Sequence, residues 1–141
     1  MTRHREVAYA LLRVTLGLVF LFSGIGKFKA GLQYVAGSML QQFSGKLPAV
    51  LVQPFVYVLP FAETTLGALI VLGLFTPFAL TFSGLLLVAL TFGTVMLGEF
   101  PTAAHNTQYA LVNFVLLWLS DLNRVSVDSA IGRRKSAVVT K

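Results

Sequence analysis

Four long apolar stretches divide this sequence, and each is long enough to cross a lipid bilayer as a helix. They run from Val7 to Gly26, Pro54 to Leu74, Pro77 to Leu97 and His105 to Leu122. Only 11% of the 141 residues are charged, against about 25% in soluble proteins. Because most connections are short, we predict an all-α fold in which residues 1–141 form a single transmembrane domain, an integral membrane four-helix bundle.

Two segments outside these stretches have their own character. Between the first two spans, residues 32–43 carry apolar side chains at helical spacing and glutamines on the other face, but they are too few to cross the bilayer. We predict a short amphipathic helix lying in the membrane interface. The tail, residues 125–141, is short and basic, and we expect it to be interfacial and then disordered.

The charges sit at the ends of the spans and predict the topology. Seven basic residues flank the first and last spans: Arg3, Arg5, Arg124, Arg133, Arg134, Lys135 and Lys141. The first loop has Lys27, Lys29 and Lys46, and the other two loops have no basic residue. The positive-inside rule therefore predicts a multi-pass protein of the bacterial cytoplasmic (inner) membrane with both termini in the cytoplasm. The net charge of +6 thus reflects topology and contact with anionic lipid rather than nucleic-acid binding.

Glu63 is the only charged residue between Val50 and Leu74, and Arg13 is the only basic residue inside an apolar stretch. A charge in hydrocarbon costs at least roughly 2.5 kcal/mol on insertion scales, so we expect both to face inward. The same reasoning applies to polar side chains that recur at helical spacing, which should line the bundle interior. In the first span these are Tyr9, Arg13 and, at its end, Lys27; in the last span they include Tyr109 and Asn113.

Counted from the predicted span ends, Arg13 and Glu63 differ in depth by about 6 Å, which an extended arginine can cover. Three alternatives follow. Arg13 and Glu63 form a structural ion pair; or Arg13 reaches the headgroups and Glu63 is protonated; or both line a pocket with Tyr9, Tyr109 and Asn113 for a small amphipathic ligand. A quinone head group suits such a pocket, since its carbonyl oxygens accept hydrogen bonds. The first and third alternatives are compatible.

The sequence lacks the residues that several kinds of metal, haem and redox site require. The sequence has no cysteine, which excludes thiolate metal sites and thiol redox chemistry by this chain. Its two histidines, His4 and His105, lie at opposite ends of the predicted bundle, so we expect neither a metal site nor a bis-histidine haem. We identify no complete catalytic site and expect no covalently bound cofactor.

The order of several short motifs resembles the DoxX family of small bacterial four-helix membrane proteins, over nearly the whole chain. The motifs are Arg13, Gly24-Ile25-Gly26-Lys27-Phe28, Pro60-x-x-Glu63-x-x-x-Gly67, Gly73-x-x-Thr76 and Asn123-Arg124-Val125-Ser126-Val127-Asp128. The clearest matches are Arg13, Lys27, Glu63 and Asp128. The resemblance implies a four-helix bundle and, from the founding members, a subunit of a thiosulfate:quinone oxidoreductase.

Two functions remain open at this point. In the first, the protein binds a quinone or similar lipid-soluble carrier and is the membrane subunit of an oxidoreductase system. In the second, it is a non-catalytic structural or accessory subunit of a larger membrane complex. In either case we expect contact with the lipid bilayer and with other membrane subunits or further copies of the chain.

Overall fold

The computed structural model describes residues 2–139, with side chains for residues 3–135, and the regular structure in this part is all helical. No strand occurs there. The elements in chain order are α1 (Thr2–Ala30), α2 (Leu32–Phe43), α3 (Ala49–Leu72), α4 (Thr76–Met96), α5 (Phe100–Trp118), the 3₁₀ turn η1 (Ser120–Leu122) and α6 (Val127–Val139).

Within the described residues, three helices are long and apolar enough to cross a membrane: α1 from Arg3 to Ala30, α3 and α4. This confirms a multi-pass membrane protein. The last of the four predicted spans falls on α5, a 19-residue helix whose first half contains His105, Asn106, Thr107 and Gln108. Its crossing of the membrane stays a prediction.

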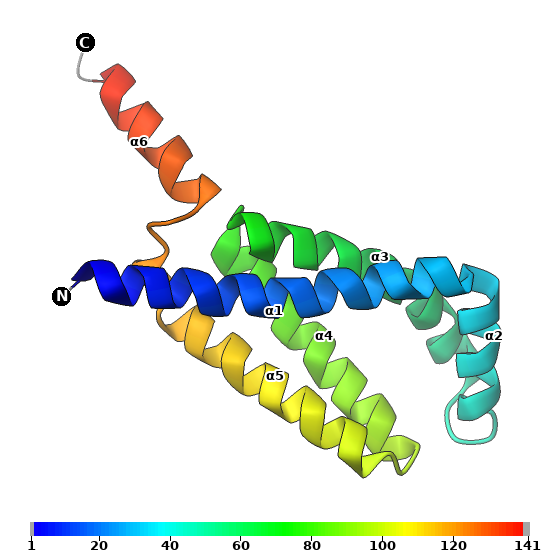
Figure 1. Cartoon of the computed structure of the whole chain (residues 1–141). Coiled ribbons are helices and arrows are strands. Elements are labelled where there is room, and N and C mark those ends of the chain that lie inside the picture. Colours follow the sequence, from blue (N-terminus) through cyan, green and yellow to red (C-terminus); the bar gives the residue numbers. More distant parts are fainter. Residues whose placement is uncertain (1, 140–141) are drawn as a thin grey trace.

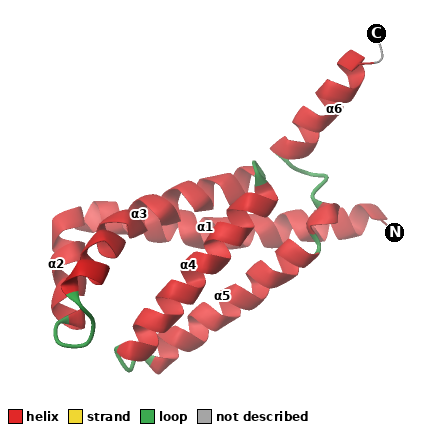
Figure 2. Ribbon diagram, turned by 180° about the vertical axis from the view of Figure 1, so that it is seen from behind, coloured by secondary structure: helices red, strands yellow, loops and turns green. Residues whose placement is uncertain are grey.

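The long helices form two antiparallel pairs. Helix α1 runs along α3, and α4 runs along α5 (Figure 1). The pairs meet near the end of the molecule that carries the N-terminus and diverge toward the end that carries α2, as the reverse view also shows (Figure 2). Helix α2 packs on the start of α3 through a small buried cluster of Ala36, Val52 and Val56.

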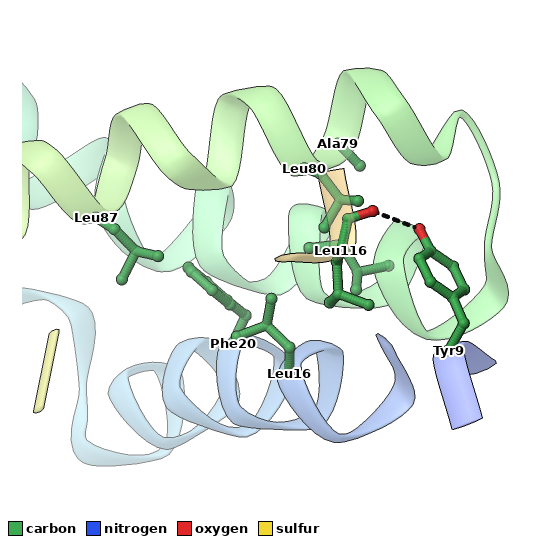
Figure 3. Packing of buried hydrophobic residues seen from close by; sticks show 8 residues of the cluster. Tyr9, Leu16, Phe20, Ala79, Leu80, Leu87 and Leu116 are labelled. Carbon is green, nitrogen blue, oxygen red and sulfur yellow. Dashed lines mark hydrogen bonds between the residues drawn. The ribbon is translucent and has the colours of Figure 1, made fainter. Parts of the chain in front are cut away.

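The main core lies where the two pairs meet. Its buried apolar residues come from α1, α3, α4 and α5 (Figure 3). They are Tyr9, Leu16, Phe20, Ile70, Ala79, Leu80, Leu87 and Leu116. The exposed faces of the same helices are also apolar, as expected where lipid is the surrounding solvent.

A tight turn joins α3 to α4 at this end. Gly73 ends α3 in the left-handed conformation, with φ 68° and ψ 43°, which glycine adopts without the steric penalty of a Cβ atom. Pro77 lies in the first turn of α4, where its missing N–H leaves no bond unmade. The turn thereby brings α4 back against α3.

The predicted disorder of the tail is wrong for residues 127–139, which form α6. The hydroxyl of Ser126 accepts a hydrogen bond from the backbone N–H of Ser129 at 3.2 Å, which satisfies a donor that a helix start otherwise leaves free. Asp128 adds a favourable negative charge to the first turn. Residues 140–141 of the predicted tail lie outside the described residues.

Candidate functional site

Close backbone contact fixes how α1 lies on α3. A Cβ atom at Gly17 would lie 2.8 Å from the backbone nitrogen of Val71, and one at Gly24 would lie 2.8 Å from the carbonyl oxygen of Pro60. A Cβ at Gly67 would meet the backbone of α1 at Leu21. Three glycines therefore let the two backbones touch, and their positions set the register of this antiparallel pair.

In this register Glu63 pairs with Lys27. The Nζ atom of Lys27 lies 2.6 Å from Oε2 of Glu63 and also donates a hydrogen bond of 2.8 Å to Oγ of Ser23. Side chains on a helix point toward its N-terminus, so Lys27 reaches back by about one turn to meet the acid. The side chain of Glu63 is 4% exposed and that of Lys27 is 20% exposed. Their opposite charges reduce the cost of holding either one inside the bundle.

The first of the three alternatives, an ion pair between Arg13 and Glu63, is wrong, because Glu63 pairs with Lys27. Arg13 lies two turns nearer the other end of α3, where Nη1 donates to the carbonyl oxygen of Val71 at 3.0 Å and also to that of Ile70. Its Nη2 donates to the carbonyl oxygen of Val125 at 2.9 Å. Arg13 is 3% exposed, so the alternative in which it reaches the headgroups is not seen either. The depth estimate failed because it used the span ends, whereas glycine contacts set the register.

A small cavity of about 70 Å³ lies beside Glu63, between the two helix pairs. Its polar lining consists of Glu63 from α3, Ser23 from α1, and Asn106 and Tyr109 from α5. Its apolar lining is Val19, Phe20, Leu87 and Leu90. Since a buried water needs roughly 10–15 Å³ of such volume, several waters or one small polar group fit. Of the five residues that the third alternative placed around one pocket, Glu63 and Tyr109 line this cavity. Arg13, Tyr9 and Asn113 do not.

A second cavity, of about 250 Å³, adjoins the first, because Leu90 lines both. It lies where the pairs diverge, between α2, α3 and α4, and most of its lining is apolar, including Phe43, Phe55 and Val56. Gln42, Thr94, Glu99 and Thr102 supply the polar part of its wall. Leu90 thus belongs both to the wall of the polar compartment at Glu63 and to the wall of a mostly apolar compartment.

Tyr9 and Asn113 lie apart from this cavity and make packing contacts. The hydroxyl of Tyr9 donates to the carbonyl oxygen of Leu116 at 2.9 Å, which joins α1 to α5 (Figure 3). The amide of Asn113 donates to the carbonyl oxygen of Leu80 at 2.9 Å and accepts from the hydroxyl of Ser83 at 2.7 Å, which joins α5 to α4. Neither side chain is among the residues that line the cavity at Glu63.

A second polar cluster, at the α3–α4 turn, was not predicted from the residues. The carboxylate of Asp128 accepts hydrogen bonds from the backbone N–H groups of Phe75 and Thr76, at 2.8 and 2.9 Å, and from the Thr76 hydroxyl. Asn123 donates to that same hydroxyl at 2.9 Å. Arg13 also donates a hydrogen bond to the carbonyl oxygen of Val125. Together these hydrogen bonds, which we call the clasp, hold the segment after α5 against the turn. The resemblance singled out Asp128, but the sequence offers no spacing that links it to residues about fifty positions earlier.

Among the side chains of residues 3–135, no group of three or more histidines and carboxylates gathers that could hold a metal ion. The site at Glu63 thus offers one acid, one amine, hydroxyl groups and an amide. These groups can donate and accept hydrogen bonds and hold a proton, but they provide no electron carrier.

Comparison with known proteins corrects the sequence-based resemblance. The family model that matches is "Methylamine utilisation protein MauE", over residues 5–101, and no DoxX model matches. The identification as a DoxX protein is therefore wrong: its motifs are short, and glycines beside a lone charge are general needs of small helical membrane proteins. No curated protein and no solved structure matches the chain. The matched region covers α1 to the start of α5, including Arg13, Lys27 and Glu63, and the chain belongs to the MauE family.

Proposed function

We propose that this MauE-family protein binds the head group of a quinone or similar lipid-soluble carrier beside Glu63, as the membrane subunit of an oxidoreductase system. The family's name indicates that this system belongs to methylamine utilisation. The observation that carries the proposal is the buried Glu63 carboxylate, which lines a cavity between the long helices while its Oε2 atom pairs with the partly buried Lys27. A buried ion pair beside space for a ligand is a common arrangement at membrane-protein functional sites.

The groups around this cavity suit a carbonyl-bearing ring. The Tyr109 hydroxyl, the Asn106 amide and the Ser23 hydroxyl can donate hydrogen bonds to carbonyl oxygens, while Phe20 and Leu90 offer apolar contact. When a quinone is reduced, its oxygens take up protons, and the Lys27–Glu63 pair is placed to supply or accept one. The electrons for that reduction come from a partner subunit, because neither the side chains at this cavity nor a thiol in this chain can carry them.

The adjoining cavity supports a ligand with a hydrocarbon tail. Its apolar wall between α2, α3 and α4 would cover the ring and the first part of such a tail, while one carbonyl group of the head group occupies the smaller polar compartment. A ligand of this shape would reach the site from the lipid. A polar solute would gain nothing from the apolar compartment.

The membrane arrangement that goes with this function has four spans, with α5 as the fourth, in one domain. We place both termini in the cytoplasm of a bacterium, and α2 at the outer interface. The seven basic residues that flank the first and last spans support this orientation.

A second candidate is a non-catalytic accessory subunit of a membrane complex. In this role the Lys27–Glu63 ion pair only stabilises the contact between α1 and α3. The broad apolar faces that α4 and α5 leave exposed also favour this candidate. Those faces could contact lipid, another subunit or a second copy of the chain. The two candidates differ in whether the isolated protein binds a carrier.

The test is binding of a short-tailed quinone analogue to the full chain in lipid nanodiscs. Tyr109→Phe removes one hydrogen bond to the ligand, so affinity should fall roughly five- to tenfold. Tyr57→Phe, on the exposed side of α3, is the matched control and should bind like the wild type. Glu63→Gln should lower quinone-dependent turnover while the complex still assembles. Absence of binding to the wild type would favour the accessory subunit.

A further inference from the structure

An open cleft of about 940 Å³ lies at the end of the molecule that carries the N-terminus, far along the chain from Glu63. It is formed by the start of α1, the linker after η1 and the start of α6. Its lining residues are Arg3, Glu6, Val7, Arg124, Val125, Ser129, Gly132 and Arg133. None of these residues belongs to the site at Glu63, so what this cleft binds does not depend on the proposed function.

The cleft is strongly basic. Three arginines face one acid, and that acid is only loosely engaged: Oε1 of Glu6 lies 3.6 Å from Nε of Arg124. Arg133 folds over the linker, donating to the carbonyl oxygen of Arg124 at 3.2 Å and to Oγ of Ser129 at 3.4 Å. Within residues 3–135, neither Arg3 nor Arg133 forms an ion pair with a carboxylate. Most of the guanidinium N–H donors therefore remain for an anion.

The position of the cleft identifies the kind of anion. Val7 and Val125, 47% and 53% exposed, form an apolar part of its wall, and Val7 is where the apolar stretch of α1 begins. The arginines thus lie at the level where a spanning helix leaves the hydrocarbon and meets phosphate groups. Guanidinium groups bind phosphate oxygens in paired, directional hydrogen bonds.

We propose that this cleft binds the phosphate of an anionic phospholipid, with the glycerol part of the lipid on Val7 and Val125. A lipid held there contacts both α1 and α6. It would therefore hold α6 against the bundle beside the linker whose Val125 carbonyl accepts from Arg13. A free phosphate ion could bind the same arginines, but it has no apolar part that could contact Val7 and Val125.

The experiment compares two double variants that lose the same charge. In Arg3→Gln/Arg133→Gln both changes fall in the cleft, whereas in Arg134→Gln/Lys135→Gln both fall on α6 outside the cleft lining. The full chain in detergent is titrated with phosphatidylglycerol, and binding is followed by native mass spectrometry. The first variant should bind roughly 25-fold more weakly than the wild type, at about fivefold per arginine, and the second within about twofold.

Equal losses in the two variants would overturn the proposal, because they would show attraction by net charge alone. Equal binding of phosphatidylcholine would overturn it as well. Inorganic phosphate is the third ligand, and if it binds as tightly as phosphatidylglycerol the occupant is a free anion, not a lipid. Should the first double variant fail to fold, Arg3→Gln alone carries the test, since Arg3 forms no ion pair in the described part of the chain.

Discussion

Arg13 serves backbone groups rather than a side-chain partner. At the end of α3 the carbonyl oxygen of Ile70 accepts one hydrogen bond, at 3.2 Å, from the backbone N–H of Gly73. The Arg13 guanidinium adds a donor to that oxygen and also supplies donors to the carbonyl oxygens of Val71 and Val125. Lysine has a single nitrogen and cannot bridge three oxygens in this fixed geometry. We therefore expect Arg13→Lys to lower the free energy of unfolding by about 2–4 kcal/mol.

The measurement for Arg13→Lys is denaturant unfolding of the purified chain in micelles. Arg5→Lys, an exposed arginine two turns earlier on α1, provides the control and should stay within about 0.5 kcal/mol of the wild type. If Arg5→Lys destabilised the protein as much as Arg13→Lys, the effect would come from replacing guanidinium by ammonium in general. The three carbonyl oxygens bound by Arg13 would then not explain it.

The sequence predicted the burial of the polar residues but not their partners. Arg13, Glu63 and Asn113 are 3–4% exposed, as the cost of a polar group in lipid requires. Which residues meet depends on the register of two helices, and a shift of one turn replaces every partner. Lys27 is adjacent in sequence to the end of the predicted first span, and only the reach of its side chain back along α1 brings it to Glu63.

At the scale of elements, the contact between α1 and α3 depends on glycine at specific positions. A Cβ at Gly24 would overlap the backbone of α3 at Pro60 and Thr64, whereas a Cβ at Gly26, on the same helix, would meet nothing within 4 Å. Gly24→Ala should therefore destabilise the protein by about 1–3 kcal/mol, because the two backbones must separate. It should also weaken the Lys27–Glu63 pair, which depends on the same register.

Gly26→Ala is the matched control for Gly24→Ala. Alanine is favoured over glycine in a helix by up to about 1 kcal/mol, so this variant should be as stable as the wild type or more so. Thermal unfolding of both variants in the same detergent provides the comparison. Similar destabilisation by both would mean that the helix contact does not depend on close approach at Gly24.

Hydrophobic patterning predicted most elements, and local capping explains the rest. The segments that form α1, α3 and α4 were visible as long apolar stretches, and α2 covers the residues for which a short helix was predicted. Helix α6 was missed because its sequence, with basic residues near its centre, lacks a clear apolar stripe. Its start depends on the Ser126 cap and on hydrogen bonds of Asp128 to the distant α3–α4 turn. Such contacts between distant parts of the chain leave no local signal.

For the whole molecule, the sequence predicted neither the pairing of the helices nor their divergence. Four apolar stretches are compatible with a closed parallel-sided bundle, but the chain instead forms two pairs joined at one end (Figure 1). The clasp around Asp128 and the core around Leu80 hold that end together, and the cavity at Glu63 and its apolar neighbour lie toward the other end. The candidate site is therefore a product of the divergence, which no single stretch of sequence encodes.

The membrane topology gives the last prediction, and the absence of cysteine makes it simple to test. We expect Ser44→Cys, after α2, and Ala104→Cys, at the start of α5, to react with a membrane-impermeant thiol reagent on intact cells. Asp121→Cys, after α5, should react only after permeabilisation, because the positive-inside rule predicts from the basic residues near it that this end lies in the cytoplasm. Reaction of Asp121→Cys on intact cells together with Ala104→Cys would mean that α5 does not cross the membrane. Reaction of Asp121→Cys alone would mean that the orientation is inverted, and Glu63 would then lie nearer the cytoplasm than the clasp at Arg13.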